Sequence, residues 1–111
     1  MSVIRAKEIL KHQFGYDSFR MNQQAAIESV LAKKDCVVLM PTGGGKSLCY
    51  QFPALYLQQL VIVVSPLIAL MKDQVEALLR QNINAGCLYS GQTDAEKRLV
   101  FATLNKGGAF I

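Results

Sequence analysis

The sequence has few cysteines and no long run of apolar residues, and both absences exclude classes of protein. Its three cysteines, Cys36, Cys49 and Cys87, lie far apart without a CxxC pair, which fits neither a disulfide framework nor a zinc site. The longest nearly apolar stretch, residues 60–71, is interrupted by Ser65-Pro66 and is shorter than the roughly 18 residues of a membrane span. Charges near the N-terminus stand where a signal peptide would be apolar. We therefore expect reduced, buried thiols in a cytosolic protein and no membrane partner.

A strong charge of either sign is also missing. The 111 residues carry a net charge of +4, and the basic residues are scattered, with no run longer than Lys33-Lys34. This distribution excludes a basic tail, while the modest positive charge is compatible with a nucleic-acid partner. Hydrophobic residues make up 51% of the chain, which argues against disorder and is enough for the core of one small domain.

One segment, Met40-Pro41-Thr42-Gly43-Gly44-Gly45-Lys46-Ser47, carries the strongest functional signal. It follows an apolar run and precedes a segment that can be helical, which is the arrangement of a phosphate-binding loop. Glycines let main-chain N–H groups converge on phosphate oxygens, and the following helix directs its positive end at the same anion. Lys46 would reach the terminal phosphates and Ser47 would hold Mg²⁺. A plain connecting turn, the alternative, would not need consecutive glycines, because they cost backbone entropy on folding.

Short apolar runs recur along the chain and alternate with segments of helical periodicity. The runs cover residues 36–40, 60–64, 85–88 and 109–111. Such alternation is typical of βαβ units, and continuously apolar strands are typical of a sheet that helices cover on both faces. The pattern therefore predicts an α/β fold with a parallel sheet and flanking helices.

Helices are predicted between these runs and ahead of them. Two precede the glycine-rich loop, over Ser2–Phe14 and Asn22–Lys33, and one follows it, where Pro53 should kink the helix or end its first segment. A clear apolar stripe predicts a helix over about Leu67–Gln81. The spacing of Thr93 and Glu96 is that of a capping box, and it predicts a last helix ending near Asn105.

Three further segments have the composition of binding sites. In Phe14–Gln23 an aromatic ring can stack on a purine, and Arg20 with Gln23 can hydrogen-bond a base edge, although aromatic residues near a helix start are more often part of a core. Ser65–Gln74 can form an anion site at a helix N-terminus or an ordinary strand-to-helix turn. Tyr89–Thr93 can touch a phosphodiester backbone, but a capped loop is the simpler interpretation.

Together these motifs resemble the RecQ-type DNA helicases of superfamily 2. Phe14-Gly-Tyr-x-x-Phe-Arg-x-x-Gln23 is similar to that family's adenine-recognition motif, and Met40–Gln51 is similar to its motif I, in which Met commonly replaces the first Walker glycine. Ser65–Gln74 is similar to motif Ia, which lies beside single-stranded DNA in such helicases. Met21 is a departure, because many relatives carry Pro there. The resemblance covers nearly the whole chain and implies part of a RecA-like P-loop domain.

The resemblance also implies a role for each matching residue in an ATP-dependent 3′–5′ DNA helicase that acts in recombination and repair. Tyr16, with Phe14, would stack on adenine, while Arg20 and Gln23 would hydrogen-bond its edge. The ATP phosphates would lie against the loop and its catalytic lysine, and Ser47 would ligate Mg²⁺. Ser65 and Lys72 would contact DNA, either single-stranded or partly duplex. The loop residues concerned are Thr42, Gly43, Gly44, Gly45 and Lys46.

The chain has no Asp-Glu pair after an apolar run, so we expect it to lack a Walker B motif. We also expect it to lack the arginine finger that the second domain of a complete motor supplies. We interpret residues 1–111 as the N-terminal part of the first helicase domain, with a helical adenine-motif segment (1–34) and βαβ units (35–111), and without the remaining helicase domains. By itself it should be catalytically inactive and poorly soluble, because a truncated sheet leaves an unpaired edge.

Two alternatives to the helicase interpretation are open at this point. One is a non-catalytic nucleotide-binding module from a truncated gene. The other is a different P-loop ATPase without a nucleic-acid role. The helicase interpretation places the protein in the cytoplasm or nucleoid of a bacterium, or in the nucleus of a eukaryote.

Overall fold

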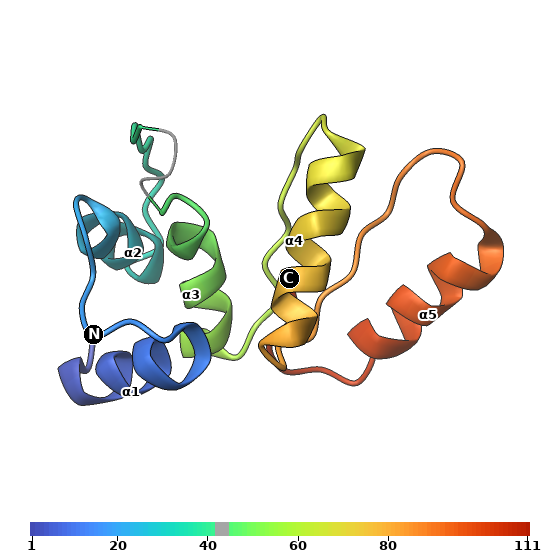
Figure 1. The fold of residues 1–111 in the computed structure, drawn as a ribbon. Helices are drawn as coiled ribbons and strands as arrows, with labels where there is room; N and C mark the ends of the chain where they lie inside the picture. Colours follow the sequence, from blue (N-terminus) through green and yellow to red (C-terminus); the bar gives the residue numbers. More distant parts are fainter. Residues whose placement is uncertain (42–44) are drawn as a thin grey trace.

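The computed structural model describes residues 1–41 and 45–111, and within these ranges the chain forms helices joined by extended or irregular segments (Figure 1). The helices are α1 (Val3–Phe14), α2 (Gln23–Leu31), α3 (Leu48–Leu57), α4 (Ile68–Arg80) and α5 (Asp94–Leu104). The predicted helices are therefore confirmed. Where the sequence predicted both ends of a helix, each observed end lies within two residues of the predicted one. None of the helices in the described ranges has the length and apolarity of a membrane span.

Local capping explains where α1 and α5 begin and end. Ser2 Oγ accepts a hydrogen bond from the Arg5 N–H at the start of α1, and Gly15 ends the helix in a left-handed conformation, with φ of 76°. At the start of α5 the Thr93 hydroxyl accepts from the Glu96 N–H, and the Glu96 carboxylate accepts from the Thr93 N–H. The predicted capping box is therefore confirmed.

Helix α3 continues through Pro53 and ends at Leu57. Pro53 lies in the sixth position of the helix, where its ring is fully buried, and Gln58 then ends α3 with a left-handed φ of 53°. Pro53 thus does not end a first helical segment, and burial of its ring offsets part of the cost of the lost backbone hydrogen bond.

The predicted parallel sheet is wrong for this structure, because the described residues contain no β-strand. A single parallel bridge joins Leu60 to Phe110, in which Val61 N–H donates to Phe110 O at 2.9 Å. The apolar runs at 36–40 and 60–64 stay largely in solvent, with Val37 91% and Val64 93% exposed. A helix satisfies its own backbone locally, whereas a parallel ladder needs partners that are distant in sequence. An apolar run alone therefore does not specify such a ladder.

The core lies mainly among α1, α2 and α3, which pack together on one side of the molecule (Figure 1). Its buried members are Ala6, Leu10, Ile27, Leu48 and Phe52. A second cluster of Leu55, Leu78 and Ile83 joins α3 to α4 and to the segment after it. Helix α5 buries none of its residues. The proposed division into residues 1–34 and 35–111 stays a prediction.

Candidate nucleotide-binding site

Gln23, the first residue of α2, joins the predicted adenine motif to the glycine-rich loop. Its side chain is 2% exposed. Its Oε1 accepts a hydrogen bond of 2.8 Å from the Arg20 N–H, and its Nε2 donates one of 2.9 Å to the Gly45 carbonyl. A buried amide with both ends paired is held in one orientation. The structure therefore brings Arg20, Gln23 and Gly45 together, and their role in binding a nucleotide stays a prediction.

Gly45 is required at its position for two independent reasons. Its φ is 79°, in the left-handed region that side chains disfavour. A Cβ at this position would also lie 2.3 Å from Gln23 Nε2 and 3.6 Å from the Arg20 guanidinium. The first of these distances is far inside van der Waals contact. The absence of a side chain at Gly45 is thus what allows Gln23 to approach the loop.

Gln23 retains hydrogen-bonding capacity beyond its two partners. A primary amide has two N–H groups and two oxygen lone pairs, and Gln23 uses one of each on Gly45 and Arg20. The N–H and the lone pair that remain are a donor and an acceptor of the types with which an adenine edge pairs. Because the side chain is 2% exposed, a base can pair with Gln23 only after the groups that cover its amide move aside.

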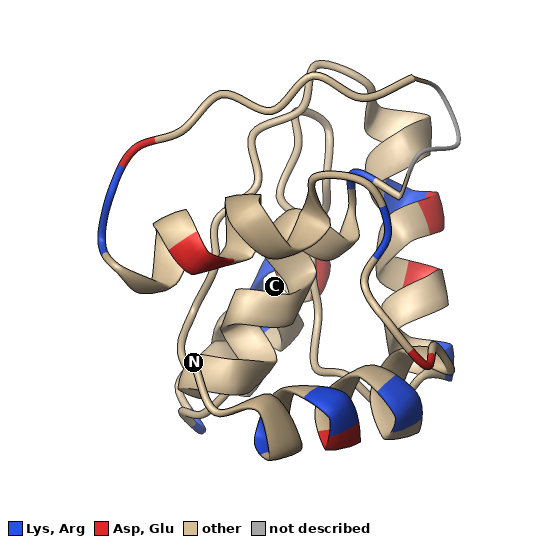
Figure 2. Ribbon diagram, turned by 90° about the vertical axis from the view of Figure 1, so that its left-hand side faces the viewer, with Lys and Arg blue, Asp and Glu red and all other residues tan. Residues whose placement is uncertain are grey.

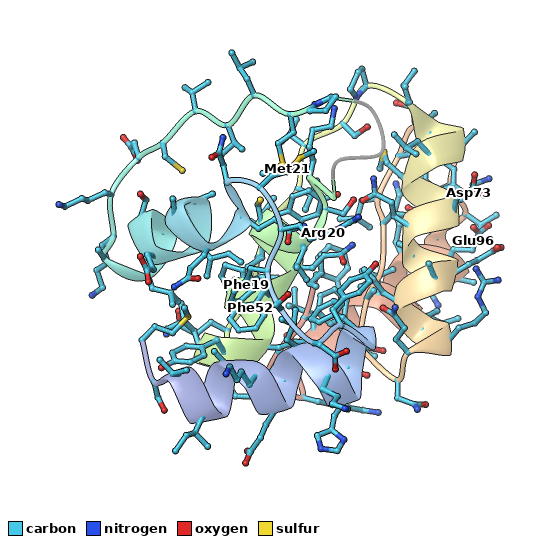
Figure 3. All side chains as sticks on the ribbon, turned by 60° about the vertical axis from the view of Figure 1, so that its left-hand side comes forward. Phe19, Arg20, Met21, Phe52, Asp73 and Glu96 are labelled. Atoms are coloured by element: carbon cyan, nitrogen blue, oxygen red, sulfur yellow. The ribbon has the colours of Figure 1, made fainter. Side chains whose placement is uncertain are left out.

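Phe19 anchors the segment ahead of α2 on α3. Its ring packs edge-to-face on Phe52, with centroids 5.2 Å apart and an interplanar angle of 79°, and Arg20 follows directly in the chain (Figure 3). Phe52 is fully buried. The sequence interpretation gave Phe19 no role of its own, although the tendency of aromatic residues near a helix start to join a core was the available signal.

The two aromatic residues predicted to stack on adenine lie in different environments. Phe14 is partly buried and packs against both core clusters, so its ring serves as core. Tyr16 is 48% exposed, and its N–H donates to Leu10 O in the turn that ends α1. Of the two, Tyr16 is the more exposed. Stacking on adenine stays a prediction for both residues.

Lys46 and Ser47 lie just ahead of α3, at the positive end of that helix. Lys46 is exposed, and the Ser47 side chain makes no capping hydrogen bond to α3. Carbonyls of Gly45 and Ser47 accept from the N–H groups of Leu48 and Gln51, so the helical turn begins within the motif. Thr42, Gly43 and Gly44 are outside the described residues. The order of loop, lysine, hydroxyl and helix start is as the sequence predicted.

These residues fit a nucleotide with an associated cation. Lys46 supplies a positive charge, the start of α3 supplies oriented N–H groups, and the Ser47 hydroxyl is available as an oxygen ligand for Mg²⁺. Bound Mg²⁺ would neutralise phosphate charge. In the described part of the chain no three His, Cys, Asp or Glu side chains gather into a metal site of their own.

Cys49, in the first turn of α3, is a poor nucleophile in this setting. Burial raises the pKa of its thiol, and the neighbouring Cys36 raises it further. A thiol with a raised pKa stays protonated near neutral pH, and the thiolate is the reactive form. The cysteines of this region are unpaired thiols, of which Cys36 is exposed and Cys49 is half-buried. The expected burial therefore holds for Cys49 only in part and fails for Cys36.

Of the two residues predicted to contact DNA, Ser65 lies just before α4 and Lys72 lies on it. Both are far from Gln23 and Gly45 in the sequence. Ser65 Oγ accepts a hydrogen bond of 3.3 Å from the Leu67 N–H, so it organises the entry to the helix. The Lys72 ammonium lies 4.7 Å from the centre of the Tyr89 ring, and the Tyr89 hydroxyl donates to Glu96 at 3.2 Å. The structure thus brings the segments 65–74 and 89–93 together, and DNA contact by either residue stays a prediction.

Charged residues of both signs lie on α1, α4 and α5, whereas α3 carries none, and Figure 2 shows both signs on α1. Lys11 and Asp17 form a salt bridge of 3.3 Å in which both side chains are largely exposed. Exposed pairs of this kind contribute little to stability. Basic and acidic residues thus occur together on these helices, as the scattered basic residues of the sequence predict.

Comparison with known proteins gives one family match and several similar proteins. The family model for DEAD/DEAH box helicases matches residues 20–107. The ATP-dependent DNA helicase RecQ of Synechocystis is 49% identical over 100 residues, which are 90% of this chain and 21% of that protein. RecQ of Bacillus subtilis is 49% identical over 109 residues, covering 96% of this chain and 18% of the relative. The RecQ-like DNA helicase BLM of Xenopus laevis is 45% identical, over 8% of its own length.

The chain belongs to the DEAD/DEAH box helicase family, because the match covers most of its length. Within that family it is similar to the RecQ helicases, with which it shares identical residues at about half of the aligned positions. The resemblance predicted from the motifs is thereby confirmed. The chain spans between 16% and 21% of the length of the first three of these relatives.

Proposed function

We propose that this chain supplies the ATP-binding part of a RecQ-type, ATP-dependent DNA helicase. The observation that supports the proposal is that buried Gln23 accepts a hydrogen bond from Arg20 and donates one to Gly45, because these bonds join the predicted adenine motif to the predicted phosphate loop. The names of the relatives, ATP-dependent DNA helicases, support the same function. A generic phosphate loop would not need a glutamine at this place.

In the proposed site each residue has one task. Arg20 and Gln23 hold the adenine edge, the loop with Lys46 holds the phosphates, and Ser47 holds Mg²⁺. The ribose and the base then fix the γ-phosphate in a single position, and positioning is the main requirement of phosphoryl transfer. Hydrolysis also requires a carboxylate that orients water, and this sequence contains no Asp-Glu pair. We propose that these 111 residues bind nucleotide, and that the whole protein hydrolyses ATP and unwinds partly single-stranded DNA in the nucleoid or nucleus.

Unwinding of a 3′-tailed duplex by the whole protein that carries this chain tests the proposal. Lys46→Ala should abolish unwinding and DNA-stimulated ATP hydrolysis, because the charge on the phosphates is lost. Lys34→Ala, a substitution outside the loop and the adenine motif, is the matched control and should retain both activities. ATP hydrolysis that ignores DNA would favour a P-loop ATPase without a nucleic-acid role. Nucleotide binding without hydrolysis would favour a non-catalytic module.

A further inference from the structure

A hydrogen bond between Tyr50 and Gln74 connects the helix after the phosphate loop to the helix of the predicted DNA segment. The Tyr50 hydroxyl donates to Gln74 Oε1 at 2.8 Å, and the two residues are 24 positions apart. Both side chains are half-buried. Among side-chain hydrogen bonds of the described residues, this is the one that joins α3 to α4. Neither residue has a role in the nucleotide site described above.

Tyr50 lies in the first turn of α3, three residues after Ser47. Its N–H donates to Ser47 O at 3.2 Å, and the Leu48 N–H donates to Gly45 O at 3.3 Å, so the residue lies in the helical turn that starts within the motif. Gly45 O is also the acceptor of Gln23. Backbone hydrogen bonds of a single helical turn therefore connect Gly45 and Ser47 to the residue that carries the Tyr50 side chain.

Gln74 is the last residue of the predicted DNA segment, Ser65–Gln74. It lies in the middle of α4, a helix of 13 residues that starts at Ile68. Leu67, the residue before the helix, donates its N–H to the Ser65 hydroxyl. Lys72, on the same helix, contacts the Tyr89 ring. A helix moves as a unit, so a force applied to Gln74 moves its N-terminal turn as well.

We propose that Tyr50 and Gln74 are positioning residues that couple nucleotide binding at the phosphate loop to DNA binding at α4. The proposal rests on the proposed function, since that function assigns ATP to the loop and DNA to the segment 65–74. Coupling of this kind is reciprocal: DNA changes the affinity for ATP by the same factor by which ATP changes the affinity for DNA. One hydrogen bond of ordinary net strength accounts for a coupling factor of about two- to tenfold.

The test is a set of nucleotide affinities measured in the whole protein, with a fluorescent, non-hydrolysable ATP analogue. Each affinity is measured with and without a single-stranded oligonucleotide, and the ratio of the two is the coupling factor. Tyr50→Phe removes the hydroxyl and retains the ring. It should lower the coupling factor by about two- to tenfold and leave the affinity without DNA nearly unchanged. Gln74→Ala should do the same, and the double variant should lose no more than either single variant.

Tyr56→Phe is the matched control. Tyr56 lies on the same helix, and its hydroxyl accepts a hydrogen bond of 2.9 Å from the Ser2 N–H beside α1 instead of α4. The coupling factor of this variant should equal that of the wild type. An unchanged factor in Tyr50→Phe, an equal loss in Tyr56→Phe, additive losses in the double variant, or a wild-type factor of one would each overturn the inference. Failure of the wild type to bind ATP would instead overturn the proposed function.

Discussion

The part of the molecule that contains α1, α2 and α3 buries far more than the part that contains α4 and α5. Phe52 and Ile27 are fully buried among the first helices, whereas α4 buries only Leu78 and α5 buries nothing. The site residues Gln23 and Gly45 lie in the well-packed part. Burial and side-chain order go together, since a residue without packed neighbours is not held in one rotamer. The part with α1, α2 and α3 is therefore the better-packed half and holds Gln23 in one orientation, whereas the α4–α5 part buries little.

The largest expected effect is the loss of stability on removal of the Phe52 ring from the core of α1, α2 and α3. Phe52→Ala removes a fully buried ring that packs on Phe19, and we expect a loss of about 3–5 kcal/mol in the free energy of unfolding. Leu99→Ala on α5 removes a side chain that is 71% exposed, so its effect should stay within about 0.5 kcal/mol. Urea denaturation followed by circular dichroism measures both. Equal losses would contradict the difference in packing between the two halves.

Gly45→Ala sharpens the comparison at the site itself. The new Cβ would collide with Gln23 Nε2, so we expect the affinity for nucleotide to fall by about tenfold or more, or 1.4 kcal/mol. Gly107→Ala is a matched control, because Gly107 has nearly the same φ, 77° against 79°, but no atom within 4 Å of the added Cβ. Titration with a fluorescent nucleotide measures both affinities. A similar loss in the two variants would attribute the effect to backbone strain instead of to Gln23.

The smallest expected effect concerns the capping box of α5. The hydrogen bond from the Thr93 hydroxyl lowers the pKa of the Glu96 carboxyl, with smaller contributions from the Thr93 N–H and Tyr89. Because the pKa is lower in the folded chain, the stabilising effect is full above the ordinary carboxyl pKa and is lost as the pH falls through the lowered value. Titration of Glu96 by nuclear magnetic resonance should show the depression, and Thr93→Ala should remove most of it. An unshifted Glu96 in the wild type would contradict the cap.

Local signals in the sequence predicted the helices but not the tertiary pairing of the apolar runs, and the roles of the site residues stay predictions. The capping box at Thr93 and the stripe in α4 depend on residues within a few positions of one another, and both were predicted correctly. The sheet was wrong, because a continuous apolar run such as residues 36–40 carries no information on its partner. At the site, the sequence assigned Gln23 to a base edge and the loop to phosphates, but it did not predict the hydrogen bond between Gln23 and Gly45. Tyr50 and Gln74 were missed, because their contact joins two helices across 24 residues.

The central claim is that Gln23 links recognition of adenine to the phosphate loop, and its most direct test is the choice of nucleotide. The ratio of the ATP and GTP affinities should be measured in the whole protein for the wild type and for Gln23→Ala. We expect the wild type to prefer ATP, and Gln23→Ala to lose most of that preference along with affinity, because the contacts to the base and to Gly45 are lost together. An unchanged preference for ATP over GTP in Gln23→Ala would contradict the account.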